Sequence, residues 1–425
     1  MKFCIEHTRQ QKTSRDYYFL GGVSVRVAML HWAFPPIIGG VESHLAMLCP
    51  ELARYGCQVS LLTGSTLEEE VDYTWRGLRI LRHRLMDLNS LDAKQIMDRR
   101  NDIRRLIGDF IQQVHPDIIH AHNMHYFSPV HLEALLEAKK RWGIPLVLTA
   151  HNVWSDSVWE KMCRHAAEWD AVIAVSHYIK KELVKAGFPE DRITVVHHGI
   201  DLERFRPPTE EDLQKAWETY PELKGKRVIF HPARMSYDKG CHISIKAFKL
   251  IKEQFPDALL VLAGTEKTVD WGSRQPEHVS RIKRLITELE LERDIFIRFF
   301  SWDEIPLMYQ AAEVSIYPSC FEEPFGLALL ESLATGRPMV VSRAGGMPEV
   351  IQDDINGYVV PMHDHEALAE RCCHLLANPQ KARQMGETGR QMVEKNFTRE
   401  VMTARTLQVY GKTLASYLRK QKQIA

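Results

Sequence analysis

Short β-branched and aliphatic runs alternate with amphipathic stretches of helical period through most of the 425 residues. Each run has the length of a buried strand, and strands that alternate with helices are typical of parallel sheets covered by helices on both faces. The pattern therefore predicts an α/β protein. The predicted strands of the first half are Val25–Leu30, Gln58–Thr63, Leu78–Arg82, Ile118–His120, Leu146–Ala150, Ala171–Val175 and Ile193–His197. Those of the second half are Val228–His231, Leu259–Ala263, Ile295–Phe299, Val314–Tyr317, Met339–Ser342 and Gly357–Val360.

The two sets of strands are separated by a polar, proline-rich stretch, Asp201 to Gly225, which predicts a linker with a short helix. The length suits two or three domains, so we expect two doubly wound domains over residues 1–205 and 206–397. The first of these domains begins with a polar extension over residues 1–24. Apolar residues at helical spacing predict one helix over residues 398–425, which can cross back to the N-terminal domain.

Composition excludes some classes of function. Lys plus Arg equal Asp plus Glu at 55 each, so no net charge favours nucleic acid as a partner. The eight cysteines are scattered without a Cys-x-x-Cys pair, which indicates free thiols in a reducing compartment. Without a signal-like or membrane-spanning apolar run, we expect a cytoplasmic protein. The basic stretch Lys412 to Lys422 leaves peripheral membrane contact as the alternative.

The segment Glu323-Pro-Phe-Gly-Leu-Ala-Leu-Leu-Glu331 carries the strongest chemical signal. Pro324 suits the first turn of a helix, so the pattern predicts a helix that begins just after Glu323. Residues 327–334 are apolar on nearly every face, which predicts a buried helix with Glu331 as a carboxylate in need of a partner or a raised pKa. Eight helical positions span roughly 12 Å, too far for both acids to hold one atom. The two carboxylates therefore fit opposite ends of one extended polar ligand.

Two features of the first half can line a ligand site. Gly39-Gly40 precedes a predicted helix, where backbone amides can face an anion, although such a pair is also common in plain turns. Histidines gather at predicted strand ends, where ligands of open α/β sheets bind; they are His120, His122, His125, His151, His197 and His198. Since no acid accompanies them at ligand spacing, cleft-lining groups are favoured over a zinc site.

In the second half, Arg234 and Lys239 lie five residues apart in the loop that follows Val228–His231. They can converge on one diphosphate, or they can be two solvated cations. A further glycine-rich loop, Gly345-Gly346-Met-Pro348-Glu349, follows the strand Met339–Ser342.

Taken in order, these motifs resemble glycosyltransferase family 4, retaining enzymes of the GT-B fold with two Rossmann-like domains that face each other across a cleft. The resemblance covers about residues 25–398 and is most specific from Tyr317 to Val350. It is carried by Gly39-Gly40, His151, Gly199-Ile-Asp201, Arg234 with Lys239-Gly240, Glu323 with Glu331, and Gly345-Gly346-Met-Pro348-Glu349.

The resemblance implies a role for each matching residue. Arg234 and Lys239 would hold the donor diphosphate, Glu331 the ribose hydroxyls, and Glu323 the transferred sugar. The amides of Phe325, Gly326 and Leu327 would assist Glu323, Gly39 and Gly40 would approach the diphosphate, and His151 would contact the sugar. His122, Tyr126 and Asn152 are candidates for the acceptor side.

The implied function is transfer of a hexosyl group from a nucleotide-diphosphate sugar to an acceptor hydroxyl, with an α-glycosidic bond formed. UDP-, GDP- and ADP-sugars remain open as donors, as do sugars, lipids and small molecules as acceptors. No Asp-x-Asp occurs, so neither a metal nor a cofactor is expected. The chain departs from the family pattern at His198, before Gly199, and in the segment Ile297 to Trp302. The second segment borders the expected base pocket, so the resemblance does not choose the nucleobase. A sugar-nucleotide epimerase and a non-catalytic sugar-nucleotide-binding protein are the alternatives.

Overall fold

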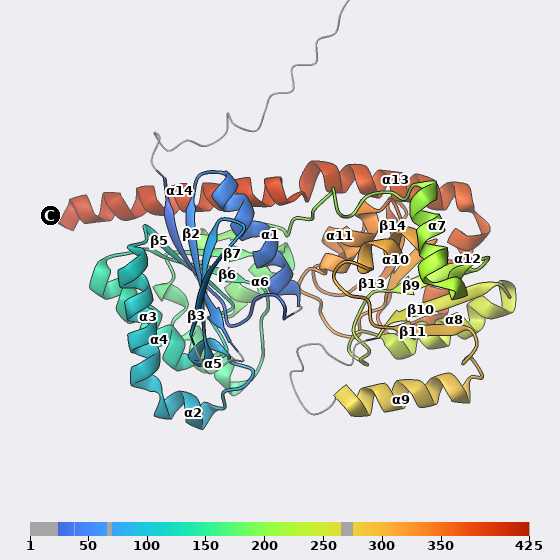
Figure 1. Ribbon diagram of the computed structural model, residues 1–425, viewed down its shortest axis with the longest axis horizontal. Helices are drawn as coiled ribbons and strands as arrows, with labels where there is room; N and C mark the ends of the chain where they lie inside the picture. The colour runs from blue at the N-terminus through green and yellow to red at the C-terminus, as the bar shows by residue number, and fades with distance from the viewer. Residues whose placement is uncertain (1–23, 38, 66–69, 265–274, 425) are drawn as a thin grey trace, which may run out of the picture.

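The computed structural model describes residues 24–37, 39–65, 70–264 and 275–424. The expected polar extension thus lies almost wholly outside the described residues. Two sheets stand side by side, one in each half of the chain (Figure 1). No helix among the described residues combines the length and the apolar character needed to cross a membrane.

The N-terminal sheet has the strand order β3-β4-β2-β1-β5-β6-β7-β8 and is parallel except for the β3–β4 pair. Its strands are β1 (Arg26–Leu30), β2 (Gln58–Gly64), β3 (Val71–Trp75), β4 (Leu78–His83), β5 (Ile118–His122), β6 (Leu146–Ala150), β7 (Ala171–Ala174) and β8 (Ile193–Val195). Its helices are α1 (Gly40–Arg54), α2 (Ala93–Asp98), α3 (Arg100–Val114), α4 (Pro129–Trp142), α5 (Ser157–Cys163) and α6 (His177–Lys185).

The C-terminal sheet is wholly parallel, with the order β11-β10-β9-β12-β13-β14. Its strands are β9 (Arg227–His231), β10 (Ala258–Ala263), β11 (Ile295–Arg298), β12 (Val314–Tyr317), β13 (Met339–Ser342) and β14 (Gly357–Val360). The helices from the linker onward are α7 (Glu210–Thr219), α8 (Cys241–Gln254), α9 (Gln275–Glu288), α10 (Ile305–Ala311), α11 (Leu327–Ala334), α12 (His365–Ala377), α13 (Pro379–Asn396) and α14 (Arg399–Ile424).

Alternating strand residues divide the core between the two faces of each sheet, because successive side chains of a strand point in opposite directions. In β1, Val27 and Met29 pack with residues of α1 and α14, whereas Ala28 and Leu30 pack with residues of α3 and α4. The C-terminal sheet is likewise covered by α8, α9 and α12 on one face and by α10 and α11 on the other.

All thirteen predicted strands are present, and β3 is an addition to the prediction. β3 is an edge strand whose residues alternate between intermediate and exposed, so it lacks the apolar run that marked the others. The turn Arg76-Gly77, with positive φ at both residues, folds it back antiparallel to β4.

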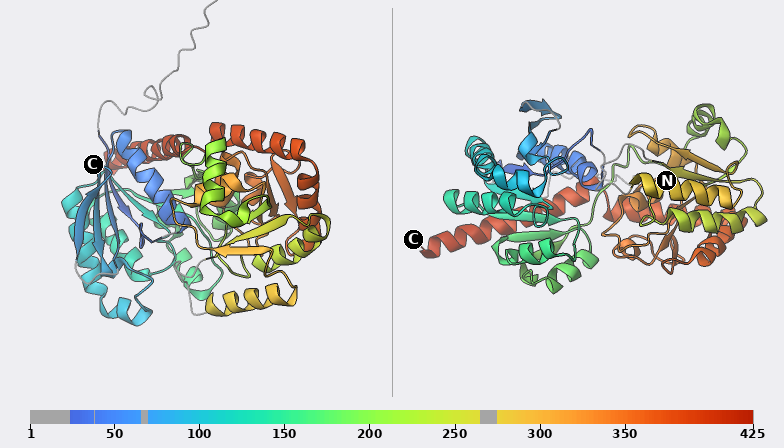
Figure 2. Two further views of the ribbon diagram at one scale, coloured as in Figure 1. Left: turned by 45° about the vertical axis from the view of Figure 1, so that its right-hand side comes forward. Right: turned by 90° about the horizontal axis from the view of Figure 1, so that it is seen from below.

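The last helix, α14, follows α13 of the C-terminal half and runs back along the N-terminal half (Figures 1 and 2). Met402, Val409 and Tyr410 of α14 join the apolar cluster on the α1 face of the N-terminal sheet. The Tyr410 hydroxyl also lies 2.7 Å from Nδ1 of His120 in β5. This helix therefore ties the two halves together.

Candidate functional site

Three loops of the C-terminal half converge beyond the carboxyl ends of the adjacent strands β9, β12 and β13, the edge at which open α/β sheets bind ligands. The Cys320 amide donates to the Asp238 carbonyl at 2.8 Å, and the Gly346 amide donates to the Glu323 carbonyl at 2.8 Å. A Cβ at Gly240 would lie 1.8 Å from the Pro318 carbonyl oxygen. The close backbone approach explains the glycine at this position.

Lys239 and Glu323 meet at the centre of these loops. Lys239 Nζ lies 2.8 Å from Glu323 Oε2, and the Tyr317 hydroxyl donates to the same oxygen at 2.9 Å. The ammonium also lies 4.5 Å from the centre of the Phe321 ring. Burial and the neighbouring carboxylate raise the pKa of Tyr317 well above its ordinary value, against a smaller opposing effect of Arg234. Arg234, Lys239 and Glu323 thus share one electrostatic environment.

The helix after Glu323 begins later than the sequence predicts. α11 starts at Leu327, and Gly326 caps it with φ of 89°. Before it, the Pro324 carbonyl accepts a hydrogen bond from the Ser176 hydroxyl at 2.6 Å, and Glu323 is tied to Gly346. The backbone of Glu323 and Pro324 is held by other loops and cannot enter the helix, so the prediction of a start just after Glu323 was wrong.

Glu331 projects from α11 and has the partner that its position requires. The Tyr309 hydroxyl donates to Glu331 Oε2 at 2.7 Å. Burial raises the pKa of Glu331, while this hydrogen bond and the charge of Arg204 oppose the rise. The guanidinium of Arg204 in turn stacks 3.6 Å above the ring of Trp302, which is 40% exposed.

The N-terminal half contributes a group of buried histidines. His122 Nδ1 lies 2.9 Å from His151 Nε2, and His44 Nδ1 lies 2.8 Å from His198 Nδ1. His120 and His122 share one face of β5, as their spacing predicts, with ring centres 4.3 Å apart. Burial lowers the pKa of all five, to about 3 for His44 and His120. These rings are therefore neutral at physiological pH.

Aromatic side chains lie beside this group. Tyr126 and Trp154 stack with ring centres 3.9 Å apart and planes 4° apart, and the Tyr126 hydroxyl donates to Asp156. His125 Nε2 lies 3.1 Å from the Asn152 carbonyl. A cavity of about 280 Å³ is lined by Val153, Trp154, Ser155, Trp159, Glu160, Glu182, Lys185 and Ala186.

The two halves of the fold are in contact between the histidine group and the loop before α11. The ring of His198 lies 5.2 Å from that of His151 and 5.1 Å from that of Phe325, which belongs to the loop before α11. Beside it, Glu349 accepts hydrogen bonds from the amides of His177 and Tyr178 at 2.8 and 2.9 Å and contacts His197 Nε2 at 2.9 Å. The carboxylate thereby caps the first turn of α6 from across the junction.

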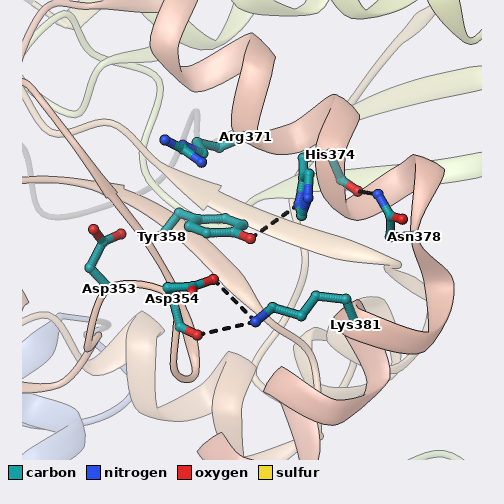
Figure 3. A pocket seen from close by; sticks show the side chains of 7 residues that line it. All are labelled: Asp353, Asp354, Tyr358, Arg371, His374, Asn378 and Lys381. Atoms are coloured by element: carbon teal, nitrogen blue, oxygen red, sulfur yellow. Dashed lines mark hydrogen bonds and ion pairs between the residues drawn. The ribbon is translucent and has the colours of Figure 1, made fainter.

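A larger cavity, of about 590 Å³, lies elsewhere on the C-terminal half (Figure 3). Two of its charged groups pair with each other, since Lys381 Nζ lies 3.1 Å from Asp354 Oδ1, and the Tyr358 hydroxyl lies 3.1 Å from His374 Nδ1. None of the residues expected to bind a donor lines it. The lining residues are Asp353, Asp354, Tyr358, Arg371, His374, Asn378 and Lys381.

Comparison with known families decides what the chain is. The profile described as Glycosyltransferase Family 4 matches residues 38–204, and the profile described as Glycosyl transferases group 1 matches residues 215–392. The two matches fall on the two halves of the fold. The chain belongs to glycosyltransferase family 4.

Relatives of this glycosyltransferase include the spore coat protein SA of Bacillus subtilis, 32% identical over 57% of this chain and 64% of that protein. The D-inositol 3-phosphate glycosyltransferase of Salinispora tropica is 28% identical over 93% of this chain and 85% of that protein. Among solved structures, HepE of Anabaena in complex with UDP and glucose matches with a TM-score of 0.72 at 20% identity, over 91% of this chain and 100% of that chain. These likenesses establish the GT-B fold for the glycosyltransferase.

The glycosyltransferase fold brings several of the residues singled out in the sequence near the junction of its halves. Arg234, Lys239 and Glu323 gather on the C-terminal side, and His151 faces Phe325 through His198. Gly39 caps α1, and a Cβ there would lie 2.2 Å from Glu42 Oε2. Around Gly40 a Cβ would meet nothing within 4 Å, so close packing does not explain that glycine.

Three residues of this glycosyltransferase site were not singled out from the sequence. His44 lies on α1 and contacts His122, His151 and His198, with ring centres 4.7–5.4 Å apart. Tyr309 and Ser176 supply hydrogen bonds to Glu331 and Pro324. The pattern Gly39-Gly40-x-Glu-x-His44 would have been a signal for His44, because it puts the histidine just inside a helix that begins at a candidate ligand site.

Proposed function

We propose that this glycosyltransferase transfers a hexosyl group from a nucleotide-diphosphate sugar to an acceptor hydroxyl with retention of configuration. The observation that carries the proposal is the meeting of Lys239 and Glu323 in one half, next to Phe325, with His198 and His151 of the other half. The arrangement gives cations for a diphosphate, a carboxylate for sugar hydroxyls and imidazoles facing them at one junction.

The Lys239–Glu323 pair suggests how a donor enters the site. A diphosphate competes for the ammonium of Lys239, and Arg234 can hold the same group with its forked donors. Glu323 is then released to accept hydrogen bonds from the sugar while Tyr317 continues to donate to it. Negative charge that develops on the leaving diphosphate is stabilised by both cations and by the amides of residues 325–327 at the start of α11.

Glu331 is suited to the ribose of the donor. Its Oε2 accepts a hydrogen bond from the Tyr309 hydroxyl. We propose that its other oxygen, Oε1, accepts hydrogen bonds from the ribose hydroxyls. The exposed ring of Trp302, covered by Arg204, lies in the segment that should border the base. An aromatic ring and a guanidinium plane both offer a stacking surface, which fits any nucleobase and leaves UDP-, GDP- and ADP-sugars as candidates.

In this proposal the acceptor binds the N-terminal half, with His122, Tyr126 and Asn152 on its side. Tyr126 stacks on Trp154, and the pair forms an apolar surface beside the cavity that Trp154 lines. Such a surface suits the apolar face of a sugar ring. Closure of the two halves would bring acceptor and donor together and exclude water.

We further propose that the transfer needs no metal. Arg234 and Lys239 would stabilise the charge of the diphosphate in place of a divalent ion. Activity that falls with EDTA and returns with Mg²⁺ or Mn²⁺ would contradict this part of the proposal.

A thermal-shift screen with UDP-, GDP- and ADP-sugars tests donor binding, beginning with UDP-glucose. A donor that binds only the folded state raises the melting temperature. The donor found is then used in transfer assays with Glu323→Gln, Arg234→Ala and Lys239→Ala, each expected to lose at least tenfold in rate. Lys246→Ala and Glu253→Gln, on exposed positions of α8, are the matched controls. Near-native rates in all three site variants would refute the assignment.

The same assays separate the alternatives. An epimerase would yield an isomerised sugar nucleotide without any acceptor, and a binding protein would show the thermal shift without turnover. Retention is checked by the anomeric configuration of the product in an NMR spectrum.

A further inference from the structure

Three buried imidazoles of the N-terminal half lie close together at the carboxyl ends of β5 and β6. His44 comes from α1, His122 from the end of β5, and His151 follows β6. Their ring centres lie 5.4, 4.9 and 5.2 Å apart, and one nitrogen of each lies within 4.8 Å of the others. His44 and His151 are 4% exposed and His122 is fully buried.

Two nitrogens of this cluster have no hydrogen-bond partner among the described residues: His44 Nε2 and His151 Nδ1. Buried polar atoms in folded proteins are almost always paired, so two orphans in adjacent rings call for a ligand. The opposite nitrogen of His44 is fixed by His198 at 2.8 Å, which orients the ring as outer partners orient metal-bound histidines. Burial keeps these rings neutral, and the neutral ring is the form that binds metals.

We propose that His44, His122 and His151 form a site for one Zn²⁺ or a similar transition-metal ion, and that an ion bound there blocks transfer. With zinc–nitrogen distances of about 2.0–2.1 Å, a tetrahedral ion holds the centres of its imidazole rings about 5 Å apart, which is close to the observed spacing. The blocking part rests on the proposed function. There, His151 contacts the donor sugar, and a ring whose nitrogen binds an ion is held away from that contact.

The surroundings select the kind of ion. The ligand set holds three imidazoles and no carboxylate, which suits zinc, copper, cobalt or nickel and not magnesium or manganese. His122 Nε2 lies 3.0 Å from Met29 Sδ and His122 Nδ1 lies 2.9 Å from His151 Nε2, so an ion bound by His122 replaces one of these two contacts. Glu42, 3% exposed, contacts His31 Nε2 at 3.2 Å, and the ring of His31 lies 6.5 Å from that of His122. This carboxylate places negative charge near the site without joining it.

Calorimetric titration of the metal-free full chain tests the site apart from activity. Zinc chloride should bind at one ion per chain, and magnesium chloride should not bind. His44→Gln should weaken zinc binding at least tenfold. His374→Gln, on the other half, should leave it unchanged, as should His177→Asn, which removes a member of the cluster His177, His197 and Glu349. Binding that survives His44→Gln, or is lost in His177→Asn, would overturn the proposal.

X-ray absorption of the zinc-loaded wild type needs no variant and covers the case in which His44→Gln fails to fold. Imidazole scattering from three rings, with nitrogens at about 2.0–2.1 Å, is the expected result. A spectrum dominated by oxygen neighbours would refute the site.

The transfer assay then tests the block. Zinc should lower the rate at least tenfold, EDTA should restore it, and the ratio of rates with and without zinc should move toward one in His44→Gln. Zinc bound at the cluster with an unchanged transfer rate would overturn the block alone. Absence of transfer with every donor before zinc is added would instead refute the proposed function, while the titration still decides the metal site.

Discussion

Lys239 and Glu323, 84 residues apart in the chain, form an ion pair with Nζ 2.8 Å from Oε2. Their side chains are only 16% and 12% exposed, and Tyr317 donates to the same carboxylate. Two groups that we propose to bind different parts of a donor thus pair with each other in this structure. Each side chain neutralises the charge of the other at a site that is mostly buried.

This pairing predicts non-additive effects on stability. Lys239→Ala or Glu323→Gln alone should lower the free energy of unfolding by about 1–3 kcal/mol, because each leaves a buried group without its partner. The double variant should lose less than the sum of the two by about 1 kcal/mol. Urea unfolding of the wild type, the two single variants and the double variant measures the coupling energy. Strictly additive losses would show that Lys239 and Glu323 do not interact.

Tyr309→Phe should weaken donor binding through Glu331. Loss of the hydroxyl removes the 2.7 Å hydrogen bond that orients the carboxylate and that opposes the rise of its pKa. We expect donor affinity to fall about 3–10-fold, the equivalent of one hydrogen bond, with the fold intact. Calorimetry with the donor measures this. An unchanged affinity would mean that Glu331 does not bind the donor or does not depend on Tyr309.

Glu349 should make the stability of the junction depend on pH. Burial alone would raise its pKa, but the hydrogen bonds from His197 and from the amides of His177 and Tyr178 outweigh burial and hold it below the ordinary value. A lowered pKa in the folded state means that the carboxylate stabilises the fold at neutral pH. The stabilisation is lost as pH falls below about 4.3, the ordinary pKa of Glu, toward the folded value.

The test compares wild type with Glu349→Gln by urea unfolding between pH 7 and pH 3. The wild type should be the more stable protein at pH 7, and the difference should shrink as the carboxylate of the wild type becomes protonated. A difference that does not depend on pH would show that the charge of Glu349 does not hold the junction.

Gly346→Ala should open the junction. A Cβ at this position would lie 2.4 Å from the Pro324 carbonyl oxygen and 3.0 Å from the Ser176 Cβ, so it wedges between the halves. Transfer should fall at least tenfold, and small-angle scattering should show a wider molecule. Gly411→Ala is the matched control, because a Cβ there meets nothing within 4 Å. A native rate and shape in Gly346→Ala would disprove tight contact at this point.

The sequence alone determined the two sheets and most of their strands. Buried parallel strands such as Leu146–Ala150 and Val314–Tyr317 are continuous apolar runs, and a run of this kind is read directly from the order of residues. The edge strand Val71–Trp75 escaped prediction because it is half exposed and its pairing comes from the turn at Arg76-Gly77. The sequence also singled out Arg234, Lys239 and Glu323, which lie in the loops after β9 and β12, and Glu331, which lies within α11.

Only the tertiary structure decided which of these groups meet. The start of α11 at Leu327 depends on hydrogen bonds from Ser176 and Gly346, both distant in the chain. The neutral histidine cluster depends on α1 packing over β5 and β6, which brings His44 to His122 and His151 and removes water from all three. Local order along the chain sets strands and helices, whereas pairing across loops and burial follow from how the sheets and their covering helices pack. No local pattern in the sequence shows which residues from distant parts of the chain will be in contact.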